Sequence, residues 1–222
     1  RMVMSRDRVD WDHLKANYPL WREKGYWIQG GPWFGFDITH ARVIGTETFL
    51  TWMIDDPELV IDIINHQLEC SLQLLDMVWD AGYTFDCIFW PDDMGYRNGT
   101  FFSVPTYREI LKPAQKRAIE WAHAKGIFAH LHSCGNINAF VPELIDIGLD
   151  ALNPLEVKAG MDPLQMKRDF GDKLVLHGGL NAMYWDHIEK IEAEMLRLVG
   201  PLKANGGYIL SSDHSVPDSV SF

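Results

Sequence analysis

Short apolar runs alternate with amphipathic stretches along most of the chain. Each run is rich in β-prone residues and has Gly, Pro, Asp or Asn at or near its end, a pattern typical of buried strands. The six runs occupy residues 26–35, 87–93, 126–135, 149–157, 173–181 and 207–215. We therefore expect six strands separated by longer segments of another kind.

The segments between the runs carry the spacing and the end signals of helices. Asp56, Pro57 and Glu58 read as an N-cap, a first-turn proline and an acidic first turn, and Gly82 ends the apolar stripe that follows. A second helix is expected over about 106–125, with a kink or a break at Pro113. Further helices are expected over about 138–147, 163–170 and 185–205.

Strands that alternate with helices at this spacing predict βα units and a parallel sheet. A doubly wound sheet and a (β/α)8 TIM barrel both fit, but no GxGxxG fingerprint follows an early strand. Polar residues instead collect at the C-terminal end of nearly every predicted strand, where a barrel builds its active site. These residues are Asp92, Asp93, His132, Cys134, Asn153, Glu156, His177, Asn181, Asp213 and His214. We expect residues 1–222 to form one TIM-barrel domain that lacks its N-terminal strands, because six strands are visible rather than eight.

The composition narrows the class of partner. The net charge is −11, which argues against nucleic acid or an anionic membrane as the main partner. The apolar stretches are broken by charges, the charged N-terminus lacks a secretory signal, and three widely spaced cysteines do not suggest a disulfide framework. We expect a cytoplasmic protein, and an exposed barrel edge makes a homo-oligomer plausible.

The stretch HLHSCG contains the most informative chemistry. Side chains two apart on a strand share one face, so His130, His132 and Cys134 point the same way. Imidazole and thiolate together suit zinc, whose catalytic sites use three protein ligands and one open position. The alternative is that His132 is a hydrogen-bonded core histidine and Cys134 a small buried thiol.

Four stretches together resemble the uroporphyrinogen decarboxylase superfamily, and within it the cobamide-dependent methyltransferase branch. They are residues 92–113, beginning DDMGYRNG, 130–156, beginning HLHSCGN, 170–181, FGDKLVLHGGLN, and 206–220, GGYILSSDHSVPDSV. The resemblance implies a TIM barrel in which His132 and Cys134 are zinc ligands. The thiol-methylating members complete the site with a second cysteine, which is absent here, so His214 is the expected third ligand.

Other polar and aromatic residues are candidates for catalysis or substrate binding. Glu156, Asp92 and Asp93 follow strands and are candidate catalytic groups, although the two adjacent carboxylates cannot share one strand face. Family counterparts of Tyr96, Arg97 and Phe101 line the pocket, and His177 precedes two glycines that allow a ligand to approach the backbone. Aromatic residues near strand ends either belong to a large aromatic core or suit a flat substrate or a corrin face: Trp33, Phe34, Phe36, Trp90, Phe101 and Phe102.

The resemblance implies methyl transfer between a small molecule and a corrinoid. The small molecule would be a thiol acceptor or a methylated donor such as a methoxylated aromatic compound. No DxHxxG cobalamin motif is present, so the corrinoid (cobalamin) would arrive on a separate corrinoid protein. Two alternatives stay open: a metal-free decarboxylase of the same superfamily that uses a carboxylate and His214, and a non-catalytic barrel fragment that folds with a partner.

Overall fold

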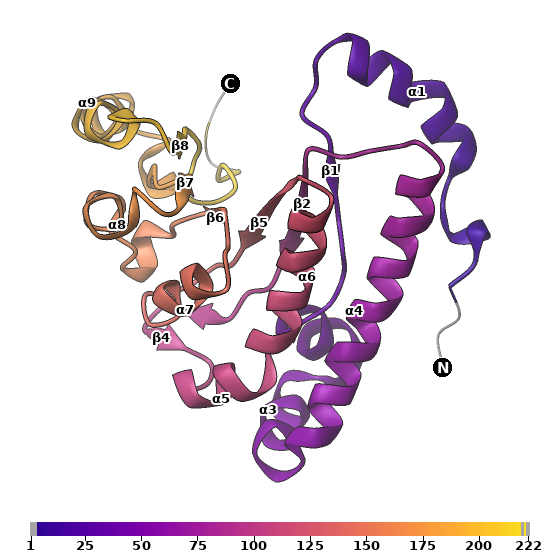
Figure 1. Cartoon of the computed structure of the whole chain (residues 1–222). Helices are drawn as coiled ribbons and strands as arrows, with labels where there is room; N and C mark the ends of the chain where they lie inside the picture. Colours follow the sequence, from indigo (N-terminus) through magenta and orange to yellow (C-terminus); the bar gives the residue numbers. More distant parts are fainter. Residues whose placement is uncertain (1–3, 219, 221–222) are drawn as a thin grey trace. The chain divides into compact units, whose positions relative to one another are not determined.

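A computed structural model describes residues 4–218 and 220 of the chain. The chain forms two compact units, one made of residues up to 91 with 108–129, the other of residues 92–107 with those from 130 onward. Helices alternate with parallel strands (Figure 1), which confirms the predicted α/β class. Among the described residues, no helix combines the length and apolar character needed to cross a bilayer.

The first unit is rich in helices and buries a cluster of aromatic side chains. Its elements are η1 (Arg6–Arg8), α1 (Trp11–Glu23), β1 (Gln29–Gly30), α2 (Phe36–Ile38), the π-helix η2 (Thr39–Ile44), α3 (Thr46–Asp55), α4 (Pro57–Asp80), β2 (Cys87–Pro91) and α6 (Lys112–Ala124). β1 and β2 pair in parallel. Phe34 stacks on Trp90 with ring centroids 5.9 Å apart, and both side chains are fully buried.

Two long helices of the first unit lie side by side, as Figure 1 shows for α4 and α6. The Asp56 carboxylate caps α4 by accepting the Leu59 N–H, as the sequence predicts. Trp121 on α6 donates its indole N–H to Asp76 on α4 at 3.1 Å. The predicted break at Pro113 is confirmed, because α5 (Val104–Ile110) ends just before α6 begins.

The second unit carries a run of parallel strands. The end of β5 (Phe128–His132) pairs with β6 (Ala151–Asn153), β6 pairs with β7 (Val175–His177), and β7 pairs with β8 (Tyr208–Ile209). The connecting elements are α7 (Val141–Asp146), η3 (Val157–Ala159), α8 (Pro163–Phe170), η4 (Ala182–Tyr184) and α9 (Ile188–Lys203). Figure 1 shows α8 and α9 next to β7 and β8. The carboxyl ends of these parallel strands therefore share one edge.

Each of the six predicted runs contains a strand, but the strands are shorter than the runs. A two-stranded hairpin, β3 (Gly95–Tyr96) with β4 (Gly99–Thr100), was not predicted from the sequence. The closed eight-stranded barrel and the single domain over 1–222 stay predictions.

Candidate metal centre

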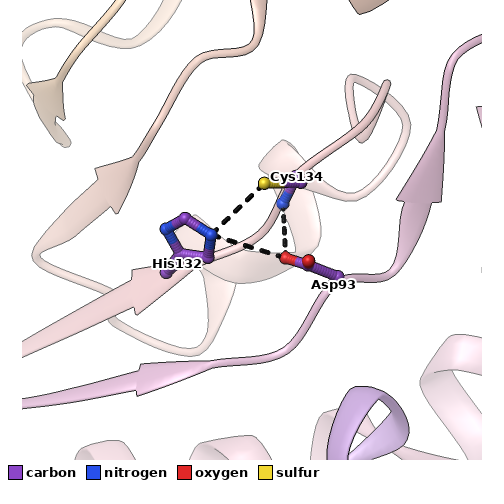
Figure 2. A group of neighbouring side chains, drawn as sticks. All are labelled: Asp93, His132 and Cys134. Atoms are coloured by element: carbon purple, nitrogen blue, oxygen red, sulfur yellow. Dashed lines mark hydrogen bonds and ion pairs between the residues drawn. The ribbon is translucent and has the colours of Figure 1, made fainter. Parts of the chain in front are cut away.

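Three metal-binding side chains meet at the carboxyl end of β5. His132 is the last residue of that strand, Cys134 lies in the turn that follows it, and Asp93 lies in the segment between β2 and β3. One ligand atom from each residue lies within 4.8 Å of the others, and all three side chains are partly exposed. Figure 2 shows the three side chains converging on one point.

The imidazole of His132 is held on both of its nitrogens. Nδ1 hydrogen-bonds to the side-chain oxygen Oδ1 of Asn153, the residue directly opposite it on β6. Nε2 lies 3.2 Å from Cys134 Sγ and 3.6 Å from Asp93 Oδ1. The nitrogen that faces the cluster is therefore Nε2.

Cys134 is held by its backbone as well as placed by its side chain. Its N–H donates to Asp93 Oδ1 at 2.7 Å. Burial raises the pKa of the Cys134 thiol, and the nearby carboxylates of Asp93 and Glu156 raise that pKa further. A divalent cation beside the sulfur would counter both carboxylates and favour the thiolate.

The turn that carries Cys134 is fastened to the segment leading into the β3–β4 hairpin. Asp92 donates its N–H to the His132 carbonyl at 2.8 Å, Met94 donates to Ser133 Oγ at 3.1 Å, and Asn136 donates to the Tyr96 carbonyl at 2.9 Å. With the bond from Cys134 to Asp93, these contacts join residues 92–96 to residues 132–136, a pair of segments that we call the site clasp.

Glu156, just before η3, supports the same turn. Its Oε2 accepts the Gly135 N–H at 2.7 Å, and its Oε1 lies 3.3 Å from Lys158 Nζ. The side chain is almost fully buried. Glu156 thus lies against the backbone of the turn that carries Cys134. Its catalytic role stays a prediction.

His214, the expected third ligand, is not brought to the cluster. Among the described residues, the carboxylate of Asp93 lies within 4.8 Å of the His132 and Cys134 ligand atoms instead. His214 is exposed, and its N–H donates to Ser212 Oγ at 3.4 Å. The neighbouring Asp213 is fully buried and accepts the N–H groups of Val157 and Ala182. Asp213 therefore holds the backbone of two loops.

Asp92 and Asp93 occupy different surroundings although they are adjacent. Asp92 is fully buried, whereas Asp93 is partly exposed. The pKa of the Tyr107 phenol is raised, first by burial and then by the charges of Asp92 and Glu143. The charge of Asp92 thus acts on Tyr107, while Asp93 lies near His132.

The expected substrate-binding residues are distributed over both units. Tyr96 is exposed at the hairpin with its ring centroid 5.5 Å from that of Phe101, and Arg97 is exposed at the same hairpin. His177 is partly buried, and its Nδ1 lies 3.3 Å from His130 Nε2. Trp33 is exposed in the first unit, where Ser71 Oγ accepts its backbone N–H at 3.0 Å. Their roles in binding stay predictions.

Three of the aromatic residues predicted near a pocket are core residues instead. Phe34, Phe36 and Trp90 have no exposed surface, and Phe36 packs on Phe49 with centroids 5.8 Å apart. Their assignment to a substrate surface was wrong, because strand-end position alone does not tell an aromatic core from an aromatic pocket.

Asn153 contacts His132, and the sequence assigned it no role. It was visible only as one of several polar residues at strand ends. The signal that identifies it is its register, because β5 and β6 pair with His132 opposite Asn153.

Comparison with known proteins places the chain in a family. Residues 30–222 match the family described as Uroporphyrinogen decarboxylase (URO-D). A "Methylcobamide:CoM methyltransferase MtaA" of Methanosarcina barkeri is 26% identical over 157 residues, covering 69% of this chain and 44% of that protein. The same-named protein of Methanosarcina barkeri (strain Fusaro / DSM 804) is 24% identical over 157 residues, with the same coverage. The chain thus spans less than half the length of these curated relatives.

The fold is also similar to that of a solved structure. A methyltransferase from Methanosarcina mazei superposes with a TM-score of 0.70 at 21% sequence identity, covering 94% of this chain and 59% of that one. The relatives carry methyltransferase names, and this confirms the resemblance to the cobamide-dependent branch inferred from the four sequence stretches. The chain belongs to the uroporphyrinogen decarboxylase (URO-D) family.

Proposed function

We propose that this protein is a corrinoid-dependent methyltransferase that holds a zinc ion with His132, Cys134 and Asp93. The observation that carries the proposal is the convergence of one imidazole nitrogen, one sulfur and one carboxylate oxygen within 4.8 Å. Zinc accepts all three donor types, and three protein ligands leave a position open for a substrate. The similarity to methylcobamide:CoM methyltransferases supports the reaction class.

The surroundings of the three side chains fit a cation. Burial raises the pKa of the Cys134 thiol, and the carboxylates of Asp93 and Glu156, which bring negative charge close to the sulfur, raise it further. The site clasp and the bond from Glu156 to Gly135 fix the backbone of the turn, so the sulfur is presented without a large search of conformations. When bound, a zinc ion would act as a Lewis acid toward a thiol or a methyl-ether oxygen.

The methyl group would pass between a small molecule and a corrinoid on a separate protein. We propose a thiol acceptor or a methylated donor, including methoxylated aromatic compounds. The exposed Tyr96 ring beside Phe101 supports an aromatic donor, because it offers a flat surface on the hairpin that is fastened to the ligand turn. Such a protein would work in the cytoplasm, where its corrinoid partner would have to meet it.

Metal analysis tests the proposal. We expect about one zinc per chain after reconstitution and dialysis, and loss of that zinc in Cys134→Ser. Cys70→Ser is the matched control, because Cys70 is a buried thiol on α4 outside the cluster. Asp93→Asn keeps an oxygen to accept the Cys134 N–H but removes the charge, and should weaken zinc by roughly tenfold or more.

The outcomes separate the candidate functions. Zinc lost in Cys134→Ser and kept in Cys70→Ser would support the methyltransferase, and transfer of methyl groups to or from a corrinoid protein would then be assayed. Wild-type protein that takes up no zinc would refute the proposed centre. A metal-free decarboxylase would then be the leading alternative.

A further inference from the structure

We infer that Asn153 is a positioning residue that fixes the tautomer and the direction of His132, and thereby makes Nε2 the nitrogen offered to a metal. The inference rests on the proposed zinc centre and extends it to a residue outside the ligand set. Asn153 ends β6, directly opposite His132, and its side chain is almost fully buried. Its Oδ1 is the partner of His132 Nδ1.

The orientation of the Asn153 amide follows from its second contact. Its Nδ2 lies 3.4 Å from the backbone carbonyl oxygen of His177. A carbonyl oxygen only accepts hydrogen bonds, so the amide nitrogen must face His177 and the amide oxygen must face His132. The assignment is therefore made by the hydrogen-bond network and does not depend on telling oxygen from nitrogen.

The amide orientation decides the state of the imidazole. An amide oxygen cannot donate, so Nδ1 of His132 must carry the proton that it shares with Asn153. In the neutral ring the lone pair is then on Nε2, which lies 3.2 Å from Cys134 Sγ. A histidine that binds a metal usually gives its other N–H to a carbonyl or carboxylate in this way.

Asn153 is held in place by backbone as well as side-chain hydrogen bonds, as a positioning residue must be. Its backbone carbonyl accepts the Ser133 N–H at 2.8 Å, so β6 is fastened to the turn on the far side of His132. Without Oδ1, the Nδ1–H of His132 would lose a fixed acceptor, and the ring would be free to rotate or to move its proton to Nε2. A proton on Nε2 blocks metal binding there.

Two substitutions separate positioning from simple packing. Asn153→Leu removes the acceptor while keeping the same number of side-chain heavy atoms. Asn153→Asp keeps an oxygen for Nδ1, loses the donor to His177 and adds a negative charge. Asn181→Leu is the matched control, because Asn181 is a hydrogen-bonded asparagine of the same unit whose Oδ1 accepts the Met183 N–H at 3.0 Å. The unfolding temperature of each metal-free variant records the cost to the fold alone.

Metal affinity is the first readout, measured on the full chain with Co²⁺ by visible absorption and with Zn²⁺ by chelator competition. We expect Asn153→Leu to weaken both metals by roughly 10- to 100-fold and to change the Co²⁺ spectrum, while Asn153→Asp stays within about threefold of the wild type. Asn181→Leu should leave affinity and spectrum unchanged. An Asn153→Leu protein that keeps wild-type affinity, or an Asn153→Asp protein that loses as much as Asn153→Leu, would overturn the inference.

A second readout needs no variant. In ¹⁵N-labelled wild-type protein without metal, the His132 ring should show its proton on Nδ1, and a proton on Nε2 would overturn the inference even if Asn153→Leu fails to fold. The two proposals fail differently. A wild-type protein that binds neither metal refutes the zinc centre together with this role, whereas unchanged affinity in Asn153→Leu refutes only the role of Asn153.

Discussion

Replacement of Gly135 by alanine tests whether the site clasp is as tight as its geometry indicates. Gly135 has φ +83°, and a Cβ built on it would lie 2.2 Å from the Gly95 carbonyl carbon and 2.5 Å from the Tyr96 nitrogen. The approach is equally close in the other direction, because a Cβ built on Gly95 would lie 2.9 Å from the Cys134 carbonyl oxygen. The substitution must therefore push the hairpin away from the ligand turn.

The expected cost has two parts. The left-handed backbone costs an L-residue roughly 1–2 kcal/mol, and forcing an extra methyl group into filled space adds about 1–3 kcal/mol. We expect Gly135→Ala to lower the free energy of unfolding by about 2–5 kcal/mol in total. Gly126→Ala isolates the first part, because Gly126 has φ +72° and nothing within 4 Å of its Cβ position.

Urea unfolding followed by circular dichroism measures both variants beside the wild type. The free energies of unfolding of the two variants should differ by about 1–3 kcal/mol. Only Gly135→Ala should also weaken zinc binding, because Gly135 directly follows Cys134. Equal losses in the two variants would show that the hairpin yields easily, and the reasoning about a fixed ligand turn would be wrong.

Two further predictions concern charged groups away from the cluster. Arg22 donates from Nη1 to both Asp86 carboxylate oxygens, at 2.8 and 2.9 Å, and from Nη2 to the Thr84 carbonyl at 2.7 Å. Because lysine cannot make this set of hydrogen bonds, Arg22→Lys should lower the free energy of unfolding in urea by about 1–3 kcal/mol. An unchanged unfolding midpoint would contradict this prediction. Burial raises the pKa of the Glu194 carboxyl, although the Asn181 N–H lowers it in part. A raised pKa means that folding favours the protonated acid. The contribution of Glu194 to wild-type stability is therefore lost as the pH rises from the pKa of this group in the unfolded chain through its pKa in the folded protein. The stability of Glu194→Gln relative to the wild type should therefore grow between pH ~4.5 and ~7 in thermal unfolding, and a constant difference would contradict the assignment.

The six strands and the closeness of His132 and Cys134 could be predicted from the sequence, but the third member of the cluster could not. His132 ends β5 and Cys134 lies only two residues further along, so the closeness of their side chains is a local property that the HxC spacing could anticipate. Asp93 could not be chosen over His214, because that choice depends on which loop folds against the turn after β5. Asp92 and Asp93 are the same residue type at adjacent positions, and they differ in the direction in which their side chains point. The hydrogen bonds of the site clasp determine that direction.

Helix α1 was not predicted from the sequence, for a different reason. α1 starts with a clear cap, since Asp10 accepts the His13 N–H, but it contains Pro19 and buries no residue. A helix without a buried stripe gives no apolar periodicity to read. α4, by contrast, buries Val60, Ile64 and Leu68 in a regular stripe, and its limits were predicted to within two residues at each end.

The site clasp also bears on how this protein can diversify. Its hydrogen bonds come mostly from backbone N–H groups of residues 92–96 and 132–136, so they do not depend on the side chains at the hairpin tip. Arg97 and Asn98 at that tip are exposed. Substitutions there can change what the hairpin presents to a visiting molecule while Asp93, His132 and Cys134 stay in place. The hairpin is thus a natural position for a randomised library, in which new substrate preferences could be selected without rebuilding the centre beneath it.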